Sequence, residues 1–459
     1  MRALSRILVF LLAALALPTA FGAPTVRAAF EDLNAPRADG ANPVPERVAH
    51  DPGKPTAVVV VGDNGAVVSD TLAPYEVLAT TGAFNVYAVA PSSRPAPLTG
   101  GLDLVPDLTF AGLADLLGGA APDVVVVPAM PDVGQRTSKP VTDWLARQAA
   151  GGALLLSVCN GAGVLASAGL LDGRRATAHW LRLDAFAEDY PAVDWVPGTR
   201  YVDDGDVIST AGILSGVDGT LRVVERLVGP GAAARAAERT GWPHYSAGRA
   251  ASIEQARVRP TDAVVGFNTA FGWDRDTIGV LLTDGVGEIE LASVFDTYGQ
   301  SLAVRTVAVA PGPVRSRHGL TFAPRAEPSA DLDRLVVPGA GAARRGAAAG
   351  HTDPVYVHQE GGFPFDGVLR DLARTTDVAT ATWTARVLEY PVDHLALDGP
   401  AWPWTRTLRP LALALLGVLV AFGLLRLVRA RRAVRSTPAA APPPPRPRTR
   451  AAAGPRRPG

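Results

Sequence analysis

The sequence predicts an α/β protein, in which a largely parallel sheet is covered by helices, with a membrane span near the C-terminal end. Three observations lead to this class. Between residues 55 and 395, short apolar runs rich in β-branched residues alternate with amphipathic stretches, which favours α/β layers over a sandwich. The first segments of this pattern occur twice along the chain. An apolar run of bilayer length follows the second occurrence.

The first predicted element is an apolar segment at 7–21. Arg2 and Arg6 precede the run ILVFLLAALALPTAF. A basic start followed by an apolar core of this length is typical of a secretory signal peptide. Residues 20–22 (AFG) form a tolerable but imperfect small-x-small cleavage site. Two interpretations therefore stay open for residues 1–29, a signal peptide or an uncleaved N-terminal anchor.

Four apolar runs follow, and each predicts a strand that is buried on both faces, as in a parallel sheet. They are AVVVV at 57–61, VYAVA at 86–90, DVVVV at 123–127 and ALLLSV at 153–158. Amphipathic stretches between them predict the covering helices.

The opening of the pattern recurs 220 residues later with the same spacing. The segment from Asp70 to Glu76 (DTLAPYE) is followed 15 residues on by a proline that closes VYAVAP. The segment from Glu290 to Asp296 (ELASVFD) is followed by VAVAP at the same distance. Further along, VDGTLRVVE at 217–225 resembles FDGVLRDLA at 365–373. The sequence therefore predicts two diverged copies.

The second predicted copy is shorter than the first. Pro128 to Asp218 spans 90 residues, whereas the corresponding Pro338 to Asp366 spans 28. The missing stretch is the one that contains Cys159 in the first copy. We expect domains at 55–247 and 275–395, separated by an Ala-rich connector near 230–272 in which Pro-Gly marks a break.

The C-terminal region predicts a transmembrane helix at 407–428. Trp402 and Trp404 precede it like an interfacial belt, and four arginines follow it closely. Residues 399–459 contain 12 Arg and no acidic residue, which leaves 32 basic against 44 acidic residues in the body. The positive-inside rule predicts an extracytoplasmic body and a cytoplasmic Pro/Arg-rich tail at 429–459, disordered by composition. The chain crosses the membrane once, or twice if the N-terminal segment is uncleaved. An acidic body argues against nucleic acid as a partner.

The single cysteine, Cys159, lies between a predicted strand and a predicted helix in ALLLSVCNGAGVLASAGLL. This arrangement is that of a nucleophile elbow, in which Gly161 permits a sharp bend. The helix N-terminus is expected to favour the thiolate. The alternative is an inert buried cysteine, because free Cys is among the most buried residue types.

The segments SVCNGAGVLASAGLLDGRRATAHW (157–180) and RYVDDGDVISTAGILSGVD (200–218) resemble the DJ-1/PfpI superfamily of class I glutamine amidotransferase-like fold. Within it they are most similar to isocyanide hydratase-like proteins and the sensing domains of AraC-type regulators. The resemblance implies a flavodoxin-like, doubly wound sheet in tandem, with a degenerate second copy. Because family domains commonly dimerise, the two copies are expected to pack as an intramolecular pseudo-dimer.

The resemblance also implies site residues. Asp70 matches the acid that sits beside the elbow cysteine, with Glu76 as a second carboxylate. A helix N-cap is the alternative role for Asp70, and a solvated or capping charge for Glu76. Asn160 and Gly161 would support the elbow. His179 matches a recurrent motif residue whose role is either structural or catalytic.

Several departures from the family pattern bear on activity. The first copy has Ala129 where a glycine would help to form an oxyanion hole, whereas the second keeps Gly339 and the acid Glu290 but has no cysteine. Asn160 replaces the histidine of peptidase-like members, which disfavours a peptidase. His351, His358 and Glu360 have loose metal-like spacing without a fourth ligand. We expect neither a metal site nor a cofactor.

Three functions remain open. The first is a membrane-anchored extracytoplasmic protein that binds a small molecule or a membrane partner after losing catalysis. The second is a Cys-dependent hydratase or hydrolase that acts on a small electrophile through Cys159 and Asp70. The third is a thiol redox sensor. The missing glycine, the shortened second copy and the anchor favour the first.

Overall fold

The computed structural model describes the chain except for residues 1, 37–47, 249–250, 349, 351–352 and 436–459. It divides into two compact units: a body of residues 20–409, and the outer parts of the terminal segments, 1–19 and 410–459. Most of the predicted tail at 429–459 lies outside the described residues.

The first half of the body contains a seven-stranded sheet of order β10-β11-β7-β6-β1-β2-β5, in which only β10 is antiparallel to its neighbour. The predicted apolar runs form its centre. The strands are β1 (Thr56–Val60), β2 (Asn85–Ala90), β5 (Leu108–Thr109), β6 (Val124–Val127), β7 (Leu154–Ser157), β10 (Tyr201–Asp204) and β11 (Val207–Thr210).

Helices cover both faces of this sheet. Alternate residues of β1 enter different cores: Ala57 and Val59 pack with α2 and α7, whereas Val58 and Val60 pack with α4 and α5. The doubly wound α/β prediction is confirmed for this half. The helices are α2 (Val68–Thr80), α3 (Phe110–Leu116), α4 (Lys139–Ala150), α5 (Gly161–Ser167), α6 (Leu183–Asp189), α7 (Ser215–Leu227) and α8 (Pro230–Thr240); a small sheet pairs β8 (Arg175–Ala176) with β9 (Asp194–Trp195).

The predicted connector at 230–272 is largely helical. Pro230, expected to mark a break, is the first residue of α8, because proline fits the first turn of a helix, where its missing N–H has no partner to lose. Helix α8 packs on α7 and α2. A second helix, α9 (Ala263–Phe271), also lies within the connector.

The second half contains a four-stranded parallel sheet of order β13-β12-β16-β17, the same order along the chain as β2-β1-β6-β7. Its elements are β12 (Thr277–Leu281), α10 (Glu288–Ser301), β13 (Arg305–Val309), β16 (Arg334–Val337), β17 (Val355–Tyr356), α11 (Pro364–Thr375) and α12 (Val378–Val387).

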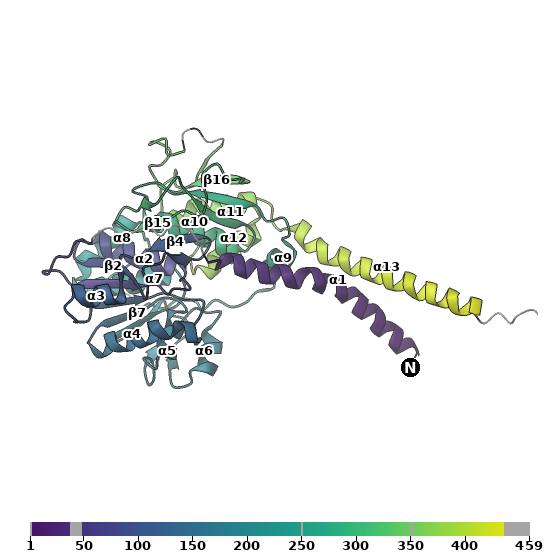
Figure 1. Ribbon diagram of the computed structural model, residues 1–459, viewed down its shortest axis with the longest axis horizontal. Coiled ribbons are helices and arrows are strands. Elements are labelled where there is room, and N and C mark those ends of the chain that lie inside the picture. The colour runs from purple at the N-terminus through teal and green to yellow at the C-terminus, as the bar shows by residue number, and fades with distance from the viewer. Residues whose placement is uncertain (1, 37–47, 249–250, 349, 351–352, 436–459) are drawn as a thin grey trace, which may run out of the picture. The chain divides into compact units, whose positions relative to one another are not determined.

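The two halves meet through one helix and one hairpin of each. Helix α2 packs on α10, and Figure 1 shows both between the strands of the first half, in blue, and those of the second, in green. The hairpins join into one antiparallel sheet, in which Val105 pairs with Thr321. Its strands are β3 (Ala96–Leu98), β4 (Leu102–Val105), β14 (Val314–Arg315) and β15 (Thr321–Ala323).

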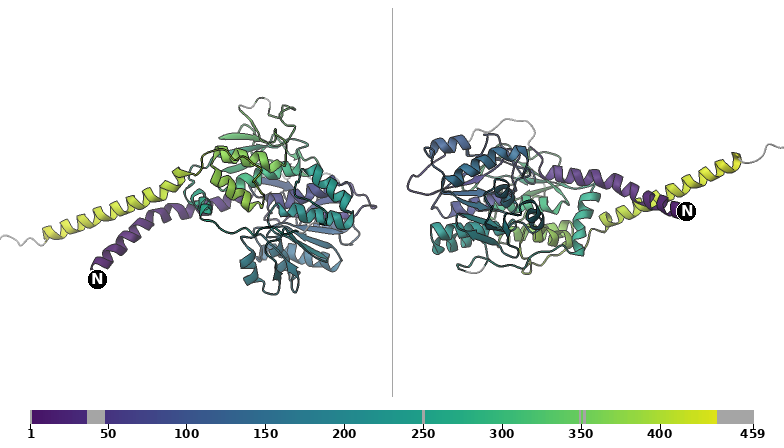
Figure 2. Two further views of the ribbon diagram at one scale, coloured as in Figure 1. Left: turned by 180° about the vertical axis from the view of Figure 1, so that it is seen from behind. Right: turned by 90° about the horizontal axis from the view of Figure 1, so that it is seen from below.

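Two terminal helices, α1 (Arg2–Leu33) and α13 (Trp404–Arg435), are long and apolar enough to cross a membrane (Figure 2). The windows that qualify have mean hydropathies of 2.1 and 2.5. The predicted span at 407–428 lies within α13. The last turns of α1 belong to the body, where Ala29 is buried and the carbonyl of Leu33 accepts a hydrogen bond from the Gly100 N–H.

Candidate functional site

Cys159 sits on a strained elbow between β7 and α5. Its φ is +56°, in the left-handed region that costs a non-glycine residue about 1–2 kcal/mol. A Cβ at Gly161 would overlap the carbonyl oxygen of Val127 on the neighbouring strand β6, so only glycine lets the elbow pass this close to the sheet. The elbow geometry thus depends on one glycine two residues beyond the cysteine.

Asp70 lies in the first turn of α2, directly beside the elbow. Its Oδ2 accepts a hydrogen bond from the Ala129 N–H at 3.0 Å, and the Cys159 thiol interacts with the same carboxyl. The N-cap of α2 is Val67, so the alternative N-cap role for Asp70 does not apply. Burial raises the pKa of Asp70 well above its usual value, against the Ala129 hydrogen bond. Burial therefore favours the protonated form of this carboxyl over the carboxylate.

The thiol of Cys159 is also protonated in this conformation. Only 3% of the residue is exposed. Burial raises the pKa of Cys159 well above its usual value, the carboxylates of Asp70 and Glu389 raise it further, and a hydrogen bond from the Asn160 N–H opposes them. The expectation of a favoured thiolate is wrong for this closed state, because burial outweighs the end of a seven-residue helix.

His179 is held by the backbone of the second half. Its Nε2 lies 2.9 Å from the carbonyl oxygen of Val387, and its Nδ1 accepts a hydrogen bond from the Leu181 N–H. Burial lowers the pKa of His179. With both ring nitrogens engaged, the neutral imidazole serves here to hold the two halves together.

The segment after α12 covers the first elbow. Trp180 donates a hydrogen bond from its indole to the carbonyl of Arg386, and the Leu214 N–H donates to Leu388. The Glu389 carboxylate accepts hydrogen bonds of 2.6 Å from the Gly212 N–H and from the Ser215 hydroxyl. A carboxylate of the second half therefore lies close enough to Cys159 to raise the pKa of the thiol.

Glu76 does not join Cys159. Its Oε2 accepts a hydrogen bond of 2.6 Å from the Ile289 N–H at the start of α10. In return, Asp296 of α10 accepts one of 3.0 Å from the Ser69 N–H at the start of α2. The carboxylates that correspond in the two predicted copies cap each other's helix, which matches the capping alternative for Glu76.

In the second half, the turn between β17 and α11, called the second elbow below, carries a histidine without the positive φ of Cys159. Strand β7 ends at Ser157 and β17 at Tyr356, each opposite the last residue of its neighbouring strand. His358 therefore lies at the same place along its sheet as Cys159, although the sequence comparison puts Cys159 in the stretch that the second half lacks. Glu290 accepts a hydrogen bond of 2.7 Å from the Ala340 N–H, much as Asp70 does from Ala129.

The Gly339 N–H is not free to stabilise an oxyanion, because it donates to Nδ1 of His358 at 2.9 Å. Nε2 of the same ring lies 3.0 Å from the Ser293 hydroxyl. Burial lowers the pKa of His358 to about 4. The second elbow therefore carries a neutral, fully hydrogen-bonded imidazole.

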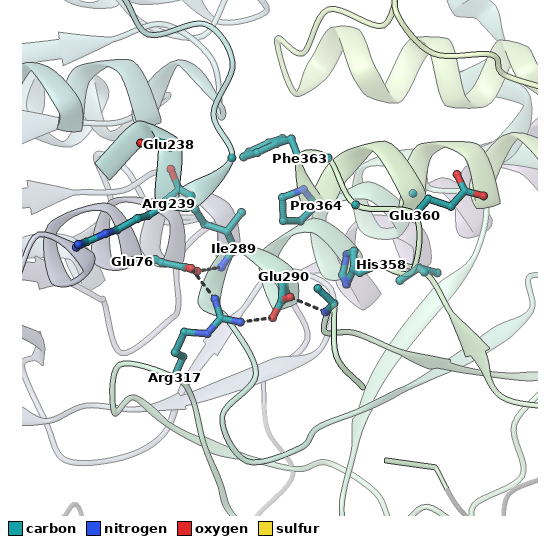
Figure 3. Close-up of a pocket in the computed structure, with 17 residues that line it drawn as sticks. Glu76, Glu238, Arg239, Ile289, Glu290, Arg317, His358, Glu360, Phe363 and Pro364 are labelled. Carbon is teal, nitrogen blue, oxygen red and sulfur yellow. Dashed lines mark hydrogen bonds and ion pairs between the residues drawn. The ribbon is translucent and has the colours of Figure 1, made fainter. Parts of the chain in front are cut away.

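The second elbow opens into a cavity of about 250 Å³ between the halves (Figure 3), whereas Cys159 at the first is buried. The end of α8, with Gly241, forms one wall, and Glu290, His358 and the start of α11 form the other. Arg317 lies between two carboxylates, 3.3 Å from Glu76 and 2.9 Å from Glu290. Glu360, from the predicted metal-like spacing, also lines this cavity, whereas His351 lies outside the described residues.

Behind this cavity, one oxygen or nitrogen atom each of Glu76, Glu288 and His318 lies within 4.8 Å of the others. These groups already have partners. His318 Nδ1 lies 2.8 Å from Glu288, whose other oxygen accepts from Ser316, and Glu76 accepts from the Ile289 N–H. Burial, with the nearby charge of Glu288, raises the pKa of Glu76 to about 7. The cluster is held by these hydrogen bonds, and its two carboxylates are buried.

Sequence reasoning missed Glu389. The signal was present in two aligned segments, TGWP at 240–243 after α8 and LEYP at 388–391 after α12. The Trp242 indole donates to Asp218, and the Tyr390 hydroxyl donates to Asp366, at matching places in α7 and α11. Position 389 therefore corresponds to Gly241, and an acidic residue at a left-handed glycine position was the clue.

Comparisons with known proteins identify relatives of this chain. The model of the DJ-1/PfpI family matches residues 56–226. Isonitrile hydratase from Pseudomonas putida is 36% identical over 162 residues, 35% of this chain and 67% of that protein. The HTH-type transcriptional regulator CdhR from Pseudomonas aeruginosa is 39% identical over 98 residues, 21% of this chain and 29% of the regulator. Among solved structures, a THiJ/PfpI family protein from Pseudomonas syringae is 28% identical, with a TM-score of 0.37, over 43% of this chain and 81% of that one.

Proposed function

Since the chain belongs to the DJ-1/PfpI family, we propose that it is a membrane-anchored extracytoplasmic protein that uses this fold to bind a small polar ligand instead of catalysing a reaction. The observation that carries the proposal is the contrast between the elbows. The elbow with the cysteine is closed by Glu389, and the elbow without it opens into a cavity of about 250 Å³.

The proposal treats the two halves as diverged copies packed as an intramolecular pseudo-dimer. It is supported by the shared strand order, the joined hairpins and the reciprocal caps at Ser69 and Ile289. In such a pair, the end of α8 lines the second elbow just as the end of α12 lines the first. The ligand site then lies between the copies.

The lining of the cavity favours a ligand rich in hydrogen-bond donors. Three acidic residues, Glu238, Glu290 and Glu360, line it. Both lining arginines already have partners: Arg317 is shared by two carboxylates, and Arg239 donates to the carbonyl of Thr80. Acceptors therefore outnumber available donors on its wall. A small ligand with amino or hydroxyl groups meets this chemistry best.

The experiment is a thermal-shift screen of the full chain in detergent against small amines, amino alcohols and polyols. Gly241→Glu introduces into the open cavity the side chain that closes the other elbow. Gly241→Ala imposes the same left-handed strain without a carboxylate. A compound that raises the melting temperature of the wild type and of Gly241→Ala, but not of Gly241→Glu, supports the proposal. Stabilisation that survives in Gly241→Glu places the ligand elsewhere and contradicts it.

Anchoring is supported by the two apolar terminal helices and by the charge distribution. Helix α13 is followed by an Arg-rich segment without acidic residues, which favours the cytoplasm, whereas the body has more acidic than basic residues. This orientation is part of the proposal.

A Cys-dependent hydratase is the second candidate, favoured by the adjacency of Asp70 to the strained Cys159 and by the similarity to isonitrile hydratase. Turnover of an isonitrile by the wild type, lost in both Cys159→Ser and Asp70→Asn, would establish it. The redox-sensor reading is disfavoured, because a buried thiol of raised pKa oxidises slowly.

A further inference from the structure

The closed elbow of the first half has the features of a binding site occupied from within. We infer that the Gly212 N–H and the Ser215 hydroxyl form a binding site for a small carboxylate beside Cys159, and that Glu389 occupies it as an internal ligand. This inference concerns the first half alone. It stands or falls independently of ligand binding in the open cavity.

The contacts of Glu389 are those of a bound anion. Both donors lie 2.6 Å from the same carboxylate oxygen, which is short for hydrogen bonds and typical of charge-assisted ones. Ser215 is the first residue of α7, a helix of 13 residues, so the carboxylate also faces the positive end of its dipole. A Cβ at Gly212 would overlap this carboxylate, so the glycine leaves room for it.

The backbone at Glu389 is strained in order to deliver this side chain. Its φ is +53°, a conformation that suits glycine, and Gly241 has φ +72° at the corresponding place. Strain of this kind persists when the surrounding contacts hold it. The hydrogen bonds of the carboxylate are the contacts that hold it here.

An independent observation comes from the other side of the elbow. Asp70 is fully buried, and its Oδ1 has no hydrogen-bond partner. Such an oxygen indicates a missing ligand atom or a proton shared with the adjacent Cys159 thiol. The elbow that Glu389 influences therefore retains a buried carboxyl oxygen that only a ligand or the Cys159 thiol can satisfy.

The chemical class of the ligand follows from the Glu389 side chain, whose place the ligand would take. The side chain of glutamate beyond Cα is a propionate, so removing it leaves a site for a monocarboxylate of two or three carbons. A ligand seated there would lie beside the only thiol of the chain. Alkylation of the chain therefore reports on Cys159 alone.

The test uses the full chain with Glu389→Gly, which empties the site and relieves the backbone strain. Alkylation by iodoacetamide is expected to be at least about tenfold faster than in the wild type, since the cover over Cys159 is gone. Millimolar propionate should slow this reaction in the variant and leave the wild type unchanged. Removing one donor with Ser215→Ala in the Glu389→Gly background should weaken the protection about tenfold, because a charge-assisted hydrogen bond is lost.

Glu389→Gln is the matched control, because glutamine keeps the shape of the glutamate side chain, and Cys159 in this variant should remain slow to alkylate. Glu389→Asn, which tolerates a left-handed backbone and is one methylene shorter, replaces Glu389→Gly if that variant does not fold. Fast alkylation without protection by propionate would show an empty space and no carboxylate site, which overturns the inference. Unchanged slow alkylation in a folded Glu389→Gly, or fast alkylation in Glu389→Gln, overturns it as well.

Discussion

At Gly161 the elbow passes so close to strand β6 that no side chain fits. We expect Gly161→Ala to lower the free energy of unfolding by about 1–3 kcal/mol, because the added methyl group must push the elbow away from the carbonyl of Val127. Denaturant unfolding measures the change. Gly266→Ala is the control: it lies in α9 with open space around it, and alanine there should raise stability by about 0.5–1 kcal/mol. Equal effects of the two substitutions would contradict the packing argument.

Glu76 makes stability depend on pH. Burial raises the pKa of Glu76 from 4.5 to about 7, so the folded state binds this proton more tightly than the unfolded state. The proton on Glu76 therefore adds to the free energy of unfolding. This addition is fully present below pH 4.5, and it is lost as the pH rises toward and through 7, by about 3 kcal/mol at most. We expect the melting temperature of the wild type to fall relative to that of Glu76→Gln between pH 5 and 8. Parallel pH profiles would contradict this prediction.

At the scale of elements, the capping pair joins α2 to α10. Asp296 accepts hydrogen bonds from the Ser69 N–H and from the Thr99 hydroxyl, and it is fully buried. We expect Asp296→Ala to cost about 1–3 kcal/mol, since two donors lose their acceptor, and Asp296→Asn to cost less. Asp143→Ala, which removes an exposed ion pair with Lys139, should change stability by less than about 0.5 kcal/mol. Denaturant unfolding of the three variants provides the comparison.

The strands of the first sheet could be predicted because their signal is local. A run such as 57–61 is apolar at every position, and burial on both faces of a parallel sheet requires that pattern. Helix α8 was missed because Pro-Gly usually marks a break, whereas here the proline begins the helix.

The site could be predicted only in part. The elbow and its acid follow from the motif, and the structure places Cys159 and Asp70 together. The position of Glu76 against α10 and of Glu389 against Gly212 depends on how the halves dock, over separations of 213 and 177 residues. Local patterns contain no information about such docking, although the aligned TGWP and LEYP segments identified the position.

For the whole molecule, the proposed orientation can be tested with the two lysines of the chain, Lys54 and Lys139. Both lie exposed on the body, and the C-terminal tail has none. A membrane-impermeant amine-reactive label applied to intact cells should therefore modify both lysines, as mass spectrometry of their peptides would show. A Lys54→Arg/Lys139→Arg double variant controls for labelling of the N-terminal amine. Labelling only after cell lysis would place the body inside and contradict the proposal.

If the two halves are diverged copies, as proposed, the occurrence of Glu389 at the place of Gly241 has a consequence for how their sites diverge. In a symmetric homodimer every substitution appears twice, so a glutamate at this position would close both sites at once. A single chain that contains both halves is free of that constraint. The first elbow can be closed while the second stays open, and the closed elbow can keep its thiol without exposing it to oxidants. In the proposed arrangement, two diverged copies in one chain can thus take different roles, which identical subunits cannot.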